Sequence, residues 1–326
     1  MDFSSETLNY ILFLPGFYIL IKSADLLVEG SVALARKLKI SDLVIGLTLV
    51  SFGTSAPELA VNVISSIRGN TDLAISNILG SNIANILLIL GISSLIRELV
   101  VQEDTTWKEI PFSLLGSIAV FLLANDVFFK ANVVNFISRN EGYILLCFFS
   151  IFLYYVYTIA RKDQENQQEL VRIETKIFIA MIYVILGLIG LVLGGNWIVK
   201  GAVQIAHFFG LSESFIGLTI VAVGTSLPEL ATSAVAAYKN NSEIAVGNVV
   251  GSNIFNVFFI LGVSAVIKPL PFSLESQIDI FGSLFSSIIL FFFMFVGKRH
   301  RLERNQGAIF LIIYFSYIVY RFTFGG

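Results

Sequence analysis

The chain has 326 residues, of which 56% are hydrophobic and only 13% are charged. Soluble globular chains carry a charge on roughly 25% of their residues, so a soluble fold could not cover this much apolar surface. The net charge of −2 argues against a nucleic-acid-binding protein, and the single cysteine, Cys147, excludes a disulfide scaffold. The composition therefore indicates a membrane protein.

Ten apolar segments are long enough to be transmembrane helices, since a bilayer takes about 20 residues per helix. They cover residues 8–30, 43–67, 73–96, 110–129, 142–160, 177–203, 214–238, 244–267, 277–297 and 307–323. The longest polar connection, residues 161–176, is too short for a domain. We expect it to be a cytoplasmic linker between a first unit, 1–160, and a second, 177–326.

The two units are copies of one another. A shift of 171 positions lays residues 46–96 over residues 217–267 without a gap, and 24 of the 51 aligned residues are identical. GTSAPELA (53–60) falls on GTSLPELA (224–231), and GSNIAN (80–85) falls on GSNIFN (251–256). Because five spans is an odd number, the second copy must enter the membrane from the opposite side. The sequence predicts an all-α polytopic membrane protein with ten transmembrane helices as two inverted five-helix repeats.

The basic residues of the loops indicate the orientation. With the N-terminus outside, 14 of the 21 Lys and Arg residues fall in cytoplasmic loops, and only six fall on the other side. Cytoplasmic loops carry an excess of Lys and Arg. We therefore expect both termini on the extracellular side of an integral membrane protein, in the cell (plasma) membrane.

Two glutamates, Glu58 and Glu229, lie at equivalent places within the second and seventh spans. A bare carboxylate inside a bilayer is costly, so each must be protonated, paired or bound to a cation. No Lys or Arg lies at matching depth in the neighbouring repeated spans. The sequence therefore predicts that these two acids bind a proton or a metal ion.

A proline directly precedes each glutamate, and this arrangement favours a bound metal ion over a bound proton. Pro57 and Pro228 have no N–H, so a carbonyl of the preceding turn loses its helical partner. Freed carbonyls, with the hydroxyls of the GTS segments, become oxygen ligands near the glutamates. The hydroxyl residues are Thr54, Ser55, Thr225 and Ser226.

Polar residues also form a stripe on the third and eighth spans, at the i, i+4, i+8 positions of one helix face. They are Asn77, Ser81, Asn85 and Asn248, Ser252, Asn256. Interhelical hydrogen bonding is the alternative role, and it carries most weight for Asn77, Asn82, Asn248 and Asn253. Carboxylates, amides, hydroxyls and carbonyls without thiolate or imidazole suit hard cations, and Ca²⁺ best accepts such an irregular oxygen cage.

The doubled GTSxPE and GSNIxN motifs resemble the two α-repeats of the sodium/calcium exchanger family, in the calcium/cation antiporter superfamily. The resemblance covers essentially the whole chain and implies a ten-helix antiporter in which spans 2, 3, 7 and 8 hold the ions. It implies that Glu58 and Glu229 bind Ca²⁺ with the carbonyls of Thr54 and Thr225. The Na⁺ ligands that it implies, besides the glutamates, are Ser55, Ser81, Ser226, Ser252 and the carbonyls of Ser51 and Ala222, with Asn85 and Asn256 between them.

The function expected is exchange of Na⁺ for Ca²⁺ by alternating access, electrogenic and independent of K⁺, because some K⁺-dependent relatives carry Asp where this chain has Asn256. A Ca²⁺/H⁺ antiporter with the same glutamates is the alternative, and a cation channel is a distant one. The sequence indicates no enzyme and no cofactor. The partners expected are Ca²⁺, Na⁺ and the lipid bilayer, with no nucleic acid and no protein partner. The compact chain lacks the large cytosolic calcium-sensing region of animal exchangers.

Overall fold

The computed structural model describes residues 3–125, 135–166, 176–209, 222–272 and 274–324. Within these residues, seven helices are long and apolar enough to cross a membrane, or eight if the bent pair Asp42–Thr54 and Ala56–Arg68 is one span. Each of the ten expected spans overlaps a helix, although their residues 126–129 and 214–221 lie outside the described residues. The chain is thus an all-α integral membrane protein.

The described residues of the first half form helices, two π-helical segments (η1 and η2) and two short strands. In chain order they are α1 (Phe3–Leu38), α2 (Asp42–Ile45), η1 (Gly46–Val50), α3 (Ser51–Thr54), α4 (Ala56–Arg68), α5 (Thr71–Ile83), η2 (Ala84–Leu90), α6 (Gly91–Ile96), β1 (Leu99–Val100), α7 (Glu103–Trp107), α8 (Glu109–Leu123), β2 (Phe136–Ile137) and α9 (Arg139–Asn166).

The second half follows the same plan. Its elements are α10 (Ile177–Phe208), α12 (Ala222–Thr225), α13 (Leu227–Tyr238), α14 (Ser242–Ile254), η5 (Phe255–Leu261), α15 (Gly262–Ile267), β3 (Leu270–Pro271), α16 (Leu274–Phe293), β4 (Arg301–Leu302) and α17 (Arg304–Phe324). From α12 to β3, every element begins 171 residues after its counterpart in α3 to β1. The repeated sequence therefore folds into repeated local structure.

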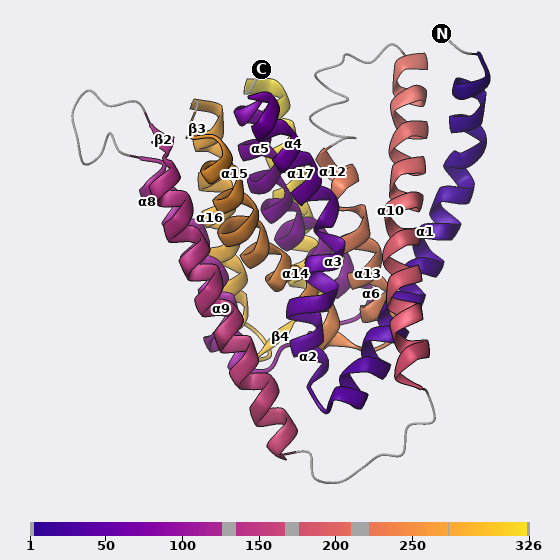
Figure 1. Ribbon diagram of the computed structural model, residues 1–326, viewed down its shortest axis with the longest axis vertical. Helices are drawn as coiled ribbons and strands as arrows, with labels where there is room; N and C mark the ends of the chain where they lie inside the picture. Colours follow the sequence, from indigo (N-terminus) through magenta and orange to yellow (C-terminus); the bar gives the residue numbers. More distant parts are fainter. Residues whose placement is uncertain (1–2, 126–134, 167–175, 210–221, 273, 325–326) are drawn as a thin grey trace.

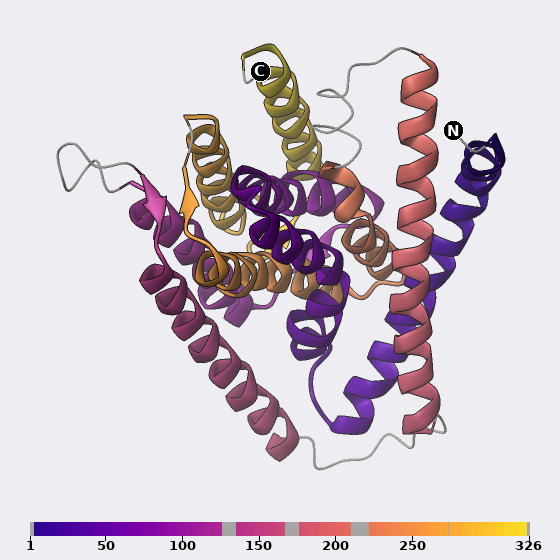
Figure 2. The ribbon, with the colours of Figure 1, turned by 45° about the horizontal axis from the view of Figure 1, so that its top comes forward.

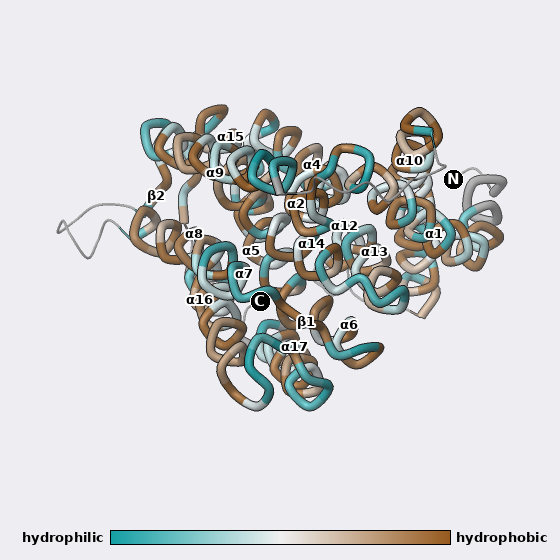
Figure 3. Tube along the Cα trace, turned by 90° about the horizontal axis from the view of Figure 1, so that it is seen from below, coloured by the Kyte–Doolittle hydropathy of each residue, from teal (hydrophilic) through white to brown (hydrophobic). Residues whose placement is uncertain are grey.

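The continuous helical stretches Thr71–Ile96 and Ser242–Ile267 form the centre of the molecule, with 83% and 78% of their most apolar segments buried. The corresponding fraction is 22% for α9 and 28% for α10. The outer helices expose large side chains such as Leu14, Tyr154 and Phe178, and hydrophobic residues follow these helices in Figure 3. Apolar residues that face outward are the side chains that contact lipid in a membrane protein.

Helices α1 and α10 run side by side at one edge of the molecule (Figures 1 and 2). Glycines make this close approach possible, because a Cβ at Gly187 would lie 2.8 Å from the backbone N of Leu27, and one at Gly194 would lie 2.9 Å from the carbonyl of Gly16. Small residues at a helix interface let the two backbones approach closely. The pair therefore packs backbone to backbone.

Two short strand pairs connect the halves. Strand β1 pairs antiparallel with β4, and β2 pairs with β3 in the register Phe136↔Pro271. The β1–β4 pair lies at the end of the molecule opposite the termini, whereas α1 begins and α17 ends at the same end as β2 and β3 (Figure 1). The basic segment before and within β4 thus lies away from both termini.

Candidate cation-binding site

Each GTSxPE segment breaks its helix at the serine. Ser55 separates α3 from α4 with φ −81° and ψ 8°, and Ser226 separates α12 from α13 with φ −88° and ψ 6°. The helices before and after Ser55 differ in direction by 46°. A proline in the first turn of each new helix has no amide hydrogen to contribute to the preceding turn. The break expected from the sequence is confirmed in both halves.

The two glutamates are buried and face hydroxyls from the opposite half. Glu58 is 0% exposed and Glu229 is 1% exposed. Ser55 donates a hydrogen bond of 2.8 Å to Oε1 of Glu229, and Ser226 donates one of 3.3 Å to Oε1 of Glu58. Each carboxyl group therefore has one oxygen bonded to the other repeat.

The polar stripes of α5 and α14 meet the same serines. Ser55 Oγ lies 3.0 Å from Ser252 Oγ, and Ser226 Oγ lies 3.2 Å from Ser81 Oγ. The Ser252 hydroxyl also donates to the carbonyl of Ser51 over 3.4 Å. The serine hydroxyls that the sequence singled out thus form two equivalent pairs, one beside each glutamate.

The threonine side chains interact both with the glutamate of the opposite half and with an asparagine. Thr54 donates to Asn248 Oδ1 over 3.0 Å, and Thr225 donates to Asn77 Oδ1 over 3.4 Å. Asn77 and Asn248 therefore make interhelical hydrogen bonds, which was the alternative role for these two residues. Ala222 begins α12 directly after residues 210–221, which lie outside the described part of the chain.

Four of the buried side-chain atoms that have no hydrogen-bond partner in the structure are oxygens of the repeated motifs. They are Glu58 Oε2, Glu229 Oε2, Asn85 Oδ1 and Asn256 Oδ1. Both asparagines are 1% exposed. Buried polar atoms are nearly always bonded, and these four are acceptors that a bound cation could satisfy.

The chemistry of these atoms selects the kind of ion. Among the described residues, no group of three or more His, Cys, Asp or Glu side chains could hold a metal ion. The groups available as ligands are instead two carboxyls and the neutral oxygens of amides, hydroxyls and carbonyls. Such a set suits hard cations of the Ca²⁺ and Na⁺ kind and not zinc or copper.

Sequence reasoning missed a cluster of two salt bridges near the end opposite the termini. Asp25 and Glu29 of α1 form salt bridges with Lys239, which follows α13, and the Lys239–Glu29 distance is 2.8 Å. Partial burial lowers the pKa of Lys239, but its bonds to the two carboxylates outweigh that effect and raise it overall. Only the fold brings these residues together, because they are more than 200 positions apart in the chain.

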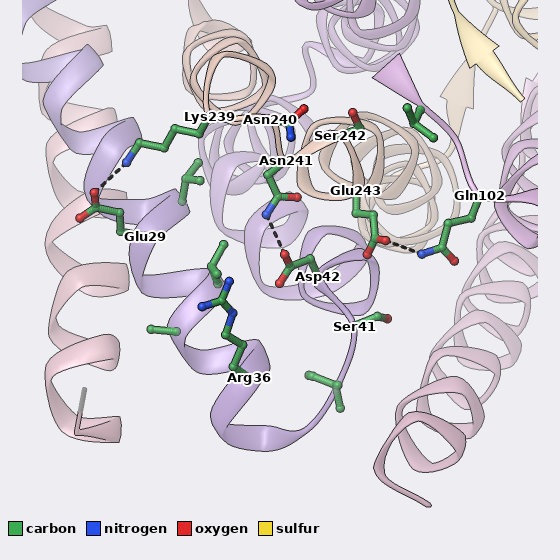
Figure 4. A pocket seen from close by; sticks show the side chains of 15 residues that line it. Glu29, Arg36, Ser41, Asp42, Gln102, Lys239, Asn240, Asn241, Ser242 and Glu243 are labelled. Carbon is green, nitrogen blue, oxygen red and sulfur yellow. Dashed lines mark hydrogen bonds and ion pairs between the residues drawn. The ribbon is translucent and has the colours of Figure 1, made fainter. Parts of the chain in front are cut away.

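The same end of the molecule has an open cavity of about 1060 Å³ (Figure 4). Glu243 accepts a hydrogen bond from the amide of Leu43 over 3.1 Å, and Asn241 donates to Asp42 over 2.7 Å. These bonds join the beginning of α2 to the beginning of α14. Glu243 therefore contacts a neighbouring helix in addition to opening its own.

Buried carboxyls within broken membrane helices, together with buried unpartnered amide oxygens, are typical of a cation-transporting membrane protein. The family model described as sodium/calcium exchanger protein matches residues 8–158 and 179–323. The chain belongs to the sodium/calcium exchanger family, whose members are antiporters.

Relatives of similar length agree with this assignment. The chain is 35% identical to the putative antiporter CaxA of Alkalimonas amylolytica over 94% of this chain and 96% of that protein. It is 30% identical to the sodium/calcium exchanger MaX1 of Methanosarcina acetivorans, over 97% and 99% of the two chains. The solved sodium-calcium exchanger NCX_Mj superimposes with a TM-score of 0.82 and 32% identity, covering 96% of this chain and 99% of that one.

Proposed function

We propose that this protein exchanges Na⁺ for Ca²⁺ across the membrane by alternating access. The observation that carries the proposal is the group of four unpartnered oxygens on Glu58, Glu229, Asn85 and Asn256. Two carboxylates balance the charge of one divalent ion, and calcium accepts six to eight oxygens in irregular geometry. The names of MaX1 and NCX_Mj as sodium/calcium exchangers support the same choice of ions.

The proposed roles follow the two motifs. Glu58 and Glu229 bind Ca²⁺ with the carbonyls of Thr54 and Thr225. Na⁺ uses the same glutamates with hydroxyls and two carbonyls, and Asn85 and Asn256 lie between them. The remaining Na⁺ ligands in this proposal are Ser55, Ser81, Ser226, Ser252, Ser51 and Ala222.

Exchange follows from competition for these shared oxygens. Na⁺ and Ca²⁺ cannot fill the site together, because they neutralise the same two carboxylates. A site without cations would carry bare charges through the bilayer, which is costly. The protein therefore changes its access only when it is loaded, and each ion can cross only in exchange for the other.

We further propose ten transmembrane spans in two inverted repeats. The equal spacing of element boundaries supports this, as does the opposite course of α1 and α10, since the chain descends through the first and ascends through the second in Figure 1. The basic segment around β4 supports a cytoplasmic location for that end. Both termini are then extracellular, in the plasma membrane.

Coupling to protons is the second candidate function. Glu58 and Glu229 could carry protons in place of Na⁺, but proton coupling would use only the two acids. The hydroxyls of Ser55 and Ser226 on those acids favour Na⁺, because hydroxyl oxygens complete the shell of a hard cation. Asn256, in place of the Asp of some K⁺-dependent exchangers, favours a cycle without K⁺.

The test is uptake of radiolabelled Ca²⁺ into proteoliposomes loaded with Na⁺, for the wild type, Glu58→Gln and Glu229→Gln. We expect uptake that requires an outward Na⁺ gradient and is lost in both variants. Asn125→Ala, at a buried asparagine that follows α8 and bonds to the Phe121 carbonyl in its last turn, is the control. Uptake driven by a pH gradient and indifferent to Na⁺ would establish the proton-coupled alternative instead.

A further inference from the structure

Four asparagines form a closed hydrogen-bond network where α5 and η2 meet α14 and η5. The inner pair donates to the outer pair, from Asn85 Nδ2 to Asn253 Oδ1 over 2.9 Å and from Asn256 Nδ2 to Asn82 Oδ1 over 3.0 Å. The outer pair donates to backbone, from Asn82 Nδ2 to the carbonyl of Asn253 and from Asn253 Nδ2 to the carbonyl of Asn82, each over 3.4 Å. Every bond joins the two halves of the chain.

The backbone carbonyls fix which way each amide points. A carbonyl can only accept, so Asn82 must direct its Nδ2 toward residue 253 and its Oδ1 toward Asn256. Asn256 can then bond to that oxygen only through its own Nδ2. Its Oδ1 is left buried and unpartnered, and the equivalent chain of bonds from Asn253 leaves the Oδ1 of Asn85 in the same condition.

This orientation matters because the two ends of an amide are chemically opposite. The oxygen can bind a cation, whereas the NH₂ group repels one. An asparagine free to rotate by half a turn would place NH₂ in the cation site for part of the time. Ligands of metal ions commonly depend on such outer hydrogen bonds for their orientation.

We propose that Asn82 and Asn253 are positioning residues that hold the amide oxygens of Asn256 and Asn85 toward the transported ions. Neither outer asparagine touches the ions; each acts through the inner asparagine of the opposite half. This inference rests on the proposed ion-binding function and adds two residues to it. It also gives a role to the third residue of each GSN motif.

The first experiment measures equilibrium Ca²⁺ binding to the purified full-length protein in detergent, for the wild type and Asn82→Leu. Leucine has a similar size and cannot accept the bond from Asn256. We expect the affinity for Ca²⁺ to fall about 10–100-fold, the range seen when outer partners of metal ligands are removed. Asn125→Leu is the matched control, and its affinity is expected to equal that of the wild type.

A double-variant comparison separates positioning from a merely structural role. A carboxylate has oxygen at both ends, so its orientation does not matter to a cation. We therefore expect Asn82→Leu to lower the Ca²⁺ affinity much less in the Asn256→Asp protein than in the wild type. A mere loss of packing around residue 82 would persist in the double variant.

The outcomes are distinct. A folded Asn82→Leu protein that binds Ca²⁺ like the wild type would overturn the inference, and so would an equal loss of affinity from Asn82→Leu in the Asn256→Asp protein. If Asn82→Leu does not fold, the same comparison can be made in the other half of the chain. The single variant is then Asn253→Leu, and the double variant is Asn253→Leu/Asn85→Asp. A wild type that binds neither Ca²⁺ nor Na⁺ would instead refute the proposed function.

Discussion

At the scale of single residues, Ser55 and Ser226 each bond to the glutamate of the opposite half. The proposal makes both hydroxyls Na⁺ ligands, whereas Ca²⁺ relies on the carboxylates and threonine carbonyls. A hydrogen bond to a charged group contributes about 1.5–3 kcal/mol. Removal of one serine hydroxyl is therefore expected to lower the affinity for Na⁺ more than the affinity for Ca²⁺.

We predict that Ser55→Ala and Ser226→Ala each raise the Na⁺ concentration needed for half-maximal Ca²⁺ uptake by about tenfold or more, since 1.4 kcal/mol is one factor of ten. The Ca²⁺ dependence should change less. Uptake titrated separately with internal Na⁺ and external Ca²⁺ checks this, and Ser286→Ala, at a buried serine bonded to the Ser283 carbonyl of its own helix, is the control. Equal losses for both ions would contradict the assignment of the serines.

The sequence predicted the residue types of the site but not their partners. Glu58, Ser81 and Asn85 stand out because they are polar within apolar spans and recur 171 positions later. The bond from Ser226 to Glu58 joins residues 168 positions apart, and local sequence contains no information about such a contact. Amide orientation is likewise a property of the folded network, so Asn82 could not be distinguished from an ordinary packing residue.

At the scale of elements, the glycines of α10 control its contact with α1. We predict that Gly187→Ala lowers the free energy of unfolding of the purified protein by about 1–3 kcal/mol, because the new Cβ would lie 2.8 Å from the backbone of Leu27. Gly195→Ala is the control on the same helix, since its Cβ would have a nearest contact of 4.0 Å, with Leu227. Unfolding of both variants, followed by intrinsic protein fluorescence, checks the prediction. Equal free energies of unfolding for the two variants would contradict this account of the interface.

Hydropathy predicted where the helices are, because each span must match the apolar thickness of a bilayer. It did not predict how α2 to α4 bend, nor the π-helical segments η2 and η5, which directly follow α5 and α14. Those features depend on contacts between buried helices. The break at Ser55 was accessible from sequence only because Pro57 cannot donate to the preceding turn.

At the scale of the whole molecule, the orientation is open to direct measurement. We predict that the variant Arg299→Cys, just before β4, reacts with a membrane-impermeant maleimide from the cytoplasmic side only. Lys268→Cys, at the same end as the termini, should react only from outside, with Cys147→Ser as the background for both. Labelling of right-side-out and inside-out vesicles checks this. The reverse pattern would place the termini in the cytoplasm.

Net charge movement is the second property of the whole molecule. If more than two Na⁺ leave for each Ca²⁺ that enters, positive charge leaves the vesicle in every cycle. We predict that an inside-positive potential, set by valinomycin and an inward K⁺ gradient, accelerates Ca²⁺ uptake into Na⁺-loaded proteoliposomes. An inside-negative potential should slow it. Rates that are insensitive to both potentials would show electroneutral exchange.

The reciprocal bonds between the halves also have a consequence for synthesis of the chain. Glu58 leaves the ribosome long before Ser226, its partner in the finished protein, has been made. Until then, the Glu58 carboxyl lies within a span that has no hydroxyl to bond to it. The insertion machinery must therefore accept this carboxyl either hydrated or protonated. The second half thus completes the first as it is inserted, and a truncated chain that ends before residue 222 would be a natural substrate for membrane quality control.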